Sequence, residues 1–196
     1  ITFVALSRCK DKNLFYCSSK VGKNMSHKAG FVSIIGYPNV GKSTLMNAFV
    51  GEQLSIITPK AQTTRHRIMG ILSGDDYQIV YSDTPGVIKP HYRLHQAMMS
   101  AVFAALEDAD VVLLVTEPGN EFNEETILRK LRDSKTPVIV VINKIDLGNM
   151  ESLEAEVEKW KEKMNQAAIL PVSALHRANL DQVFKAIYRL LPDAPP

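Results

Sequence analysis

The sequence contains little cysteine and no long apolar run. Its two cysteines, Cys9 and Cys17, lie in the first 28 of 196 residues. A core without cysteine is consistent with a reducing compartment. No apolar run approaches the roughly 20 residues that a membrane-spanning helix needs. With 45% apolar and 22% charged residues, the composition is that of a soluble globular protein large enough for one well-buried domain.

The chain also has little net charge, and its small positive excess comes from the first 28 residues. The formal charge is +2, but residues 1–28 hold six basic residues against Asp11 alone, so the remainder carries 17 basic and 20 acidic residues. The body of the protein is therefore mildly acidic. Global charge gives no case for nucleic-acid binding.

Residues 1–28 show no sustained period beyond an apolar start at residues 1–6, and they are rich in Lys and Ser. Three interpretations compete: a disordered extension, an organelle transit peptide, or sequence upstream of a true start at Met25. We expect a disordered or non-native extension over 1–28, one domain over 29–191 and the start of an interdomain linker at 192–196. The expected location is the cytoplasm, or a mitochondrion or chloroplast if residues 1–28 are a transit peptide.

From residue 31 onward, β-rich runs alternate with helical patterns, which predicts an α/β fold with a mainly parallel sheet and helices on both faces. The predicted strands span residues 31–35, 67–73, 78–83, 111–116, 138–143 and 168–172. The predicted helices span residues 42–50, 94–107, 121–133, 150–165 and 180–190. Asp75 and Asp76 favour a hairpin between the second and third strands.

A phosphate-binding loop lies between the first strand and the first helix. The run fits G-x-x-x-x-G-K-[ST] and consists of Gly36, Tyr37, Pro38, Asn39, Val40, Gly41, Lys42 and Ser43, with Thr44 opening the helix. The glycines permit a tight turn whose N–H groups converge on phosphate oxygens at a helix N-terminus. Lys42 is expected to reach the β- and γ-phosphates and Ser43 to ligate Mg²⁺.

A second motif, Asp83-Thr84-Pro85-Gly86, closes a later strand. An Asp at this place can hold Mg²⁺ through water, and Gly86 can offer its N–H to a γ-phosphate without a side chain in the way. Taken alone, Asp-x-x-Gly is more often an ordinary turn.

A third motif, Asn143-Lys144-Ile145-Asp146, points to guanine. The Asp146 carboxylate can accept from both N1–H and the 2-amino group, which adenine lacks. Asn143 is expected to fix the loop and bond the base edge, with the Lys144 stem over the ring. A backbone amide for guanine O6 is expected from the run Ser173-Ala174-Leu175. Without the phosphate loop, the motif would be a capped turn.

In this order, each at the carboxyl end of a strand, the motifs outline a ligand crevice of an open α/β sheet. From about residue 27 to 196, the chain resembles the Era family of translation-factor-class, P-loop GTPases. The specific similarities are the phosphate loop with its continuation to Asn47, the runs Gln62-Thr63-Thr64-Arg65-His66-Arg67 and Asp83-Thr84-Pro85-Gly86-Val87.

The resemblance implies further roles for single residues. Thr64 is the expected Mg²⁺ ligand of switch I, with Thr63 as the neighbour that could replace it; Ser43 and Asp83 complete the metal set. Val87 stands where many small GTPases carry a water-orienting Gln. Families similar to this one instead use K⁺, held partly by the Asn at position 39, to supply charge at the transferring phosphate. The expected catalytic residues are Lys42, Asn39, Thr64 and Gly86.

The resemblance also implies a function: Mg²⁺-dependent hydrolysis of GTP to GDP as a switch in assembly of the small ribosomal subunit. Era-like proteins contact ribosomal RNA through a KH-type domain, whose Gly-x-x-Gly clamp is not found in these 196 residues. A monomer and peripheral membrane association are further implications of the family. The alternatives are a nucleotide-gated binding module with negligible turnover, which Val87 keeps open, and a ribosome-assembly GTPase of tandem-domain type.

Overall fold

The computed structural model describes residues 2–8, 27–51, 64, 66–87 and 93–195. Its strands are β1 Thr2–Arg8, β2 Lys28–Gly36, β3 Ile68–Ser73, β4 Tyr77–Asp83, β5 Val111–Thr116, β6 Val138–Ile142 and β7 Ala168–Pro171. Its α-helices are α1 Lys42–Val50, α2 Arg93–Glu107, α3 Glu125–Asp133, α4 Met150–Lys163 and α5 Leu180–Leu190, and a short 3-10 helix, η1, spans Ile145–Leu147. The six predicted strands and five predicted helices are therefore confirmed, although α3 begins four residues later than expected.

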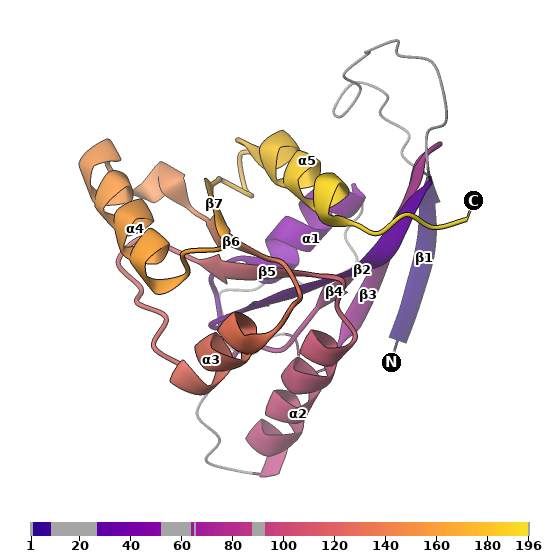
Figure 1. Cartoon of the computed structure of the whole chain (residues 1–196), viewed down its shortest axis with the longest axis horizontal. Helices are drawn as coiled ribbons and strands as arrows, with labels where there is room; N and C mark the ends of the chain where they lie inside the picture. The colour runs from indigo at the N-terminus through magenta and orange to yellow at the C-terminus, as the bar shows by residue number, and fades with distance from the viewer. Residues whose placement is uncertain (1, 9–26, 52–63, 65, 88–92, 196) are drawn as a thin grey trace.

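The strands form one sheet in the order β1-β3-β4-β2-β5-β6-β7 (Figure 1). β3 and β4 pair antiparallel through the predicted hairpin, and the other neighbours in the sheet pair parallel. This is the predicted α/β fold with a mainly parallel sheet and helices on both faces. The carboxyl ends of β2, β5, β6 and β7 meet at one edge of the sheet, where such folds bind ligands.

One strand is additional to the six that were predicted. Thr2–Arg8 forms β1 and pairs parallel with β3, so the sheet has seven strands. The expectation of disorder is wrong for residues 2–8. Without β1, the outer row of β3 backbone groups would be an unpaired sheet edge, and the segment at the start of the chain covers it. Residues 9–26, including both cysteines, lie outside the described residues.

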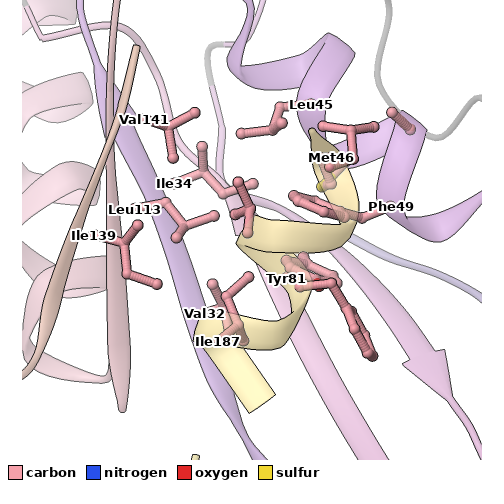
Figure 2. Packing of buried hydrophobic residues seen from close by; sticks show 14 of the residues in the cluster. Val32, Ile34, Leu45, Met46, Phe49, Tyr81, Leu113, Ile139, Val141 and Ile187 are labelled. Atoms are coloured by element: carbon pink, nitrogen blue, oxygen red, sulfur yellow. The ribbon is translucent and has the colours of Figure 1, made fainter. Parts of the chain in front are cut away.

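The core is divided between the two faces of the sheet. On one face, α1 and α5 cover residues such as Val32, Ile34 and Leu113, and Phe49 stacks on Tyr81 with ring centroids 5.2 Å apart (Figure 2). On the other face, α2, α3 and α4 pack with alternate strand residues and bury Trp160. Strand residues thus alternate between two apolar layers, as a sheet buried on both faces requires.

The last described residues pack on the start of β2. Ala29 N donates to Pro192 O at 3.3 Å, and Ala194 N donates to His27 O at 2.7 Å. Lys28 Nζ donates to Leu191 O at 2.8 Å. The segment expected to open a linker is therefore docked on the domain as far as residue 194. Within the described ranges, none of the helices has the length and apolar character to cross a membrane.

Candidate functional site

The phosphate loop turns between β2 and α1 through two residues of left-handed conformation. Asn39 has φ 65° and Gly41 has φ 94°. A Cβ at Gly41 would lie 2.2 Å from Asn143 Nδ2, so only glycine fits where the phosphate loop meets the third motif. Asn39 is exposed on the loop. The predicted strand-loop-helix context of the motif is confirmed.

Lys42 is a buried cation at the first turn of α1. Its exposed fraction is 6%, and Nζ donates to Tyr37 O in the same loop at 2.8 Å. Burial lowers the pKa of Lys42 from 10.5 to about 8, while the nearby Asp83 carboxylate opposes this lowering. The ammonium group is thus held close to the loop backbone. Its burial costs desolvation free energy, which a bound phosphate anion would offset.

The three predicted metal ligands converge. Ser43 Oγ donates to Asp83 Oδ2 at 2.6 Å, and Thr64 Oγ1 lies 3.3 Å from both of these atoms. Asp83 is fully buried and Thr64 nearly so. Two hydroxyls and a carboxylate form the hard oxygen set that Mg²⁺ prefers, so these residues fit that ion. Thr63, the alternative ligand, and Arg65 lie outside the described residues.

The second motif and the residue after it are fixed to the end of β2, where the phosphate loop begins. Val87 N donates to Gly36 O at 2.9 Å, and Thr84 Oγ1 donates to Ile34 O at 2.7 Å. A Cβ at Gly86 would lie 2.7 Å from Pro38 N. Gly86 therefore packs closely against the phosphate loop, and the expected contact of its N–H with a γ-phosphate stays a prediction. The Val87 side chain is 1% exposed and belongs to the apolar core.

The third motif meets the phosphate loop through Asn143. Asn143 Nδ2 donates to Val40 O at 2.8 Å, and Oδ1 accepts from Ala174 N at 2.9 Å. The loop-fixing role expected of Asn143 is thus visible in its contacts. The Ala174 amide therefore already donates to Asn143, and Ser173 N donates to Ala178 O at 3.2 Å. A bond from Ala174 to guanine O6 therefore requires Asn143 to release this amide.

Asp146 is held ready to accept hydrogen bonds. It follows Ile145 in η1, and its Oδ1 accepts from Ser173 Oγ at 2.5 Å while Oδ2 lies 3.8 Å from His176 Nε2. The hydroxyl of Ser173 is the main cause that lowers the pKa of Asp146, and His176 and Lys144 contribute. The carboxylate is therefore ionised at neutral pH, as bidentate recognition of guanine requires.

Sequence reasoning missed residues that support the motifs from neighbouring loops. Lys144 Nζ lies 2.5 Å from Glu117 Oε2. The Tyr37 ring packs on Phe122 with centroids 4.7 Å apart, and its hydroxyl accepts from Asn123 N at 3.1 Å. Glu117 follows directly after β5, so a polar residue at the end of a buried strand was the available signal.

Comparison with known proteins identifies the same architecture. Residues 31–144 match the model of a family described as 50S ribosome-binding GTPase. A curated relative from Alkaliphilus metalliredigens, named GTPase Era, is 43% identical over 173 residues, which are 87% of this chain and 59% of that protein. The chain thus spans less than two thirds of the length of this relative.

Two solved structures of Era are similar in backbone as well as in sequence. A single-substitution variant of Aquifex aeolicus Era bound to GDP.AlF4⁻ is 39% identical, with a TM-score of 0.81 over 86% of this chain and 59% of that chain. Era in complex with MgGDPNP and nucleotides 1506–1542 of 16S ribosomal RNA is also 39% identical, with a TM-score of 0.81 over 87% of this chain and 59% of that chain. The predicted resemblance to the Era family is confirmed. By its matched residues and the motifs gathered at one edge of its sheet, the chain belongs to the family of 50S ribosome-binding GTPases.

Proposed function

We propose that this domain binds GTP with Mg²⁺ and hydrolyses it to GDP and phosphate. One observation carries the proposal: Ser43, Thr64 and Asp83 meet within 3.3 Å of one another beside the buried Lys42. Asn143, in the third motif, donates a hydrogen bond to Val40 O and so connects that motif to the phosphate loop. Both ends of a nucleotide, its phosphates and its base, can thus be bound at one edge of the sheet.

At the phosphate end, Lys42 exchanges its bond to Tyr37 O for a phosphate oxygen, and the backbone N–H groups of residues 39–43 cradle the phosphates. Ser43 and Thr64 would hold Mg²⁺ directly, and Asp83 would hold it through water. When bound, the ion neutralises charge on the phosphates. Gly86 offers its N–H to the γ-phosphate, because no side chain separates it from the loop.

At the base end, the Asp146 carboxylate accepts from guanine N1–H and the 2-amino group. Ser173 keeps the carboxylate in place by its hydrogen bond at 2.5 Å. Adenine would leave this carboxylate without donors, at a cost of several kcal/mol, on the order of 10³-fold or more in preference. The domain is therefore proposed to select GTP over ATP.

We propose that Asn39, with K⁺, supplies positive charge at the transferring phosphate. Two observations support this. Val87 is buried in the core and has no polar side-chain atom to present, so the usual water-orienting side chain is replaced by apolar packing. Asn39 is exposed on the phosphate loop, where its amide oxygen is a hard ligand suited to an alkali cation. The variant that tests this role is Asn39→Ala, which removes the amide oxygen proposed to bind K⁺.

The wider role is proposed from the relatives. A solved relative is Era with a fragment of 16S ribosomal RNA, which supports a switch in small-subunit assembly for the protein to which this domain belongs. RNA contact is assigned to a KH-type domain outside these 196 residues. We further propose that the domain is a monomer in the cytoplasm, with peripheral membrane association as in the family that it resembles. Pelleting of the full-length protein with purified ribosomal subunits in GTP and in GDP tests the role.

Release of phosphate from GTP by the 196-residue chain, measured in K⁺ and in Na⁺, tests the activity. Turnover that requires Mg²⁺ and is faster in K⁺ supports the proposal. Tight GTP binding with negligible turnover in both salts would instead identify a nucleotide-gated binding module, the alternative that Val87 keeps open. Lys42→Ala is the control, because it removes the phosphate contact and should abolish both binding and turnover.

A further inference from the structure

Glu117 contacts the base-binding motif without being part of it. It follows the last residue of β5, and its Oε2 lies 2.5 Å from Lys144 Nζ. Its Oε1 accepts a hydrogen bond from Asn120 Nδ2 at 3.2 Å. Thr116 Oγ1 donates to the carbonyl of Asn120 at 3.2 Å, which closes the loop on itself. The Glu117 carboxylate is therefore fixed from two sides.

This loop lies against the loop that carries Lys144. Asn143 N donates to Thr116 O at 2.8 Å, which extends the pairing of β5 with β6. A Cβ at Gly148 would lie 3.9 Å from the ring of Pro118. The carboxylate thus approaches Lys144 from a backbone that is itself anchored to the third motif.

The pair is less exposed to solvent than a typical surface ion pair of the described residues. The side chains of Lys144 and Glu117 are 32% and 24% exposed. In the pair Lys130–Glu107 the corresponding values are 40% and 67%. Solvent screens an exposed ion pair and leaves its side chains mobile. The Glu117 carboxylate is partly buried and is held by two polar partners, so it fixes the position of the Lys144 ammonium group.

Lys144 gains from such a partner. It has the left-handed φ of 61°, and its four-carbon stem carries many rotamers. A stem that must lie flat over a base loses those rotamers when the base arrives. A stem already tied at its ammonium end has lost them beforehand, which is preorganisation of the site.

We propose that Glu117 is a positioning residue for the nucleotide base, acting through Lys144. It sets the affinity for any purine whose ring lies under the Lys144 stem, while Asp146 selects which purine is bound. The inference rests on the proposed guanine site. Loss of Glu117 should lower the affinity for nucleotide without changing the base preference, whereas loss of the Asp146 carboxylate should change the base preference.

The test is titration of the full 196-residue chain, in Mg²⁺, with GDP and with IDP, whose base lacks the 2-amino group. Glu117→Ala should weaken both by about tenfold, the size typical of coupled neighbours, and leave their ratio within about twofold of the original. Asp146→Asn should change the ratio instead. Glu107→Ala, which removes the exposed pair with Lys130, is the matched control and should leave both affinities unchanged.

A double-mutant cycle separates positioning from general structure. In the background of Lys144→Ala, Glu117→Ala should cause no further loss, because its partner is already gone. An equal loss in both backgrounds, or a changed GDP-to-IDP ratio in Glu117→Ala, would overturn the inference. If Glu117→Ala fails to fold, Glu117→Gln is the substitute, because it keeps the volume of the side chain and removes its charge. This variant should still bind both nucleotides more weakly than the unmodified chain, although by less than is expected for Glu117→Ala. Failure of the unmodified chain to bind GDP would contradict the proposed function itself.

Discussion

Replacing Lys42 by methionine should stabilise the nucleotide-free protein while it removes triphosphate binding. Lys42 is 6% exposed, and burial lowers its pKa from 10.5 to about 8. At pH 7 this lowering corresponds to a cost of about 3 kcal/mol in the free energy of unfolding. The hydrogen bond from Nζ to Tyr37 O offsets about 1 kcal/mol of that cost. We therefore expect Lys42→Met to gain about 2 kcal/mol, or roughly 4–8 °C in Tm.

The pH dependence of this gain follows from the direction of the shift. Between pH 8 and 10.5 the folded protein has released the Lys42 proton, but the unfolded chain still holds it. Because the unfolded state binds more protons there, stability of the unmodified protein rises with pH through this window. The advantage of Lys42→Met should fall by about 2 kcal/mol between pH 7 and pH 9.5. Subtracting one protein from the other cancels the effects of Tyr81 and Tyr188, whose pKa values folding raises.

The assay is urea unfolding after removal of Mg²⁺ and nucleotide, followed by the fluorescence of Trp160, the single tryptophan, which is 2% exposed. Lys185→Met is the matched control: Lys185 is exposed on α5, and its removal should change stability by less than about 0.5 kcal/mol at either pH. A Lys42→Met protein less stable than the original at pH 7 would refute the burial cost. So would a stability difference that does not change with pH.

Three further substitutions test the site and the fold. Asp146→Asn should shift binding from guanine toward xanthine nucleotides, because the new amide donor suits the xanthine 2-oxo group; unchanged preference in competition binding would contradict the role of Asp146. Asn39→Ala should abolish the faster turnover in K⁺, and a K⁺-independent rate in the unmodified chain would rule out the ion. Tyr188→Phe should cost about 1 kcal/mol of stability in thermal unfolding, because it removes the 2.7 Å hydrogen bond to Asp76; no loss would show that this bond contributes nothing to stability.

Local sequence signals predicted most of the fold because pattern and tertiary packing agree there. α1, β5 and α5 have the predicted bounds residue for residue, since each follows a clear apolar period or a glycine boundary. The start of α3 was misplaced because Phe122 fits the helical period but belongs to a loop. There it packs on the Tyr37 ring, and Asn123 N bonds the Tyr37 hydroxyl. A contact with the phosphate loop, far earlier in the chain, decides its conformation.

The site was predictable to the extent that its chemistry is carried by contiguous motifs. Ser43, Asp83 and Asp146 could each be assigned from their neighbours in sequence and from the end of a strand. Glu117 could be suspected from its place after a buried strand, but its role could not be assigned, because it depends on Lys144, which reaches it only after β5 and β6 pair. The strand β1 was missed for a similar reason, since its pairing partner β3 begins only at Ile68. Non-local pairing leaves a weak trace in a single sequence.

The burial of Val87 limits what the second motif can contribute to the proposed hydrolysis. Its side chain packs in the core, and its N–H is spent on Gly36 O at 2.9 Å, so this residue offers neither a side chain nor an amide to the attacking water. Gly86, one residue earlier, presses its backbone against Pro38, which leaves the second motif only a main-chain donor to contribute. Among the described residues, we expect additional positive charge to come from K⁺ held at the phosphate loop, where Asn39 is exposed. If K⁺ has no effect on turnover, we expect a cationic side chain from a partner to supply the charge, and intrinsic hydrolysis should then be slow.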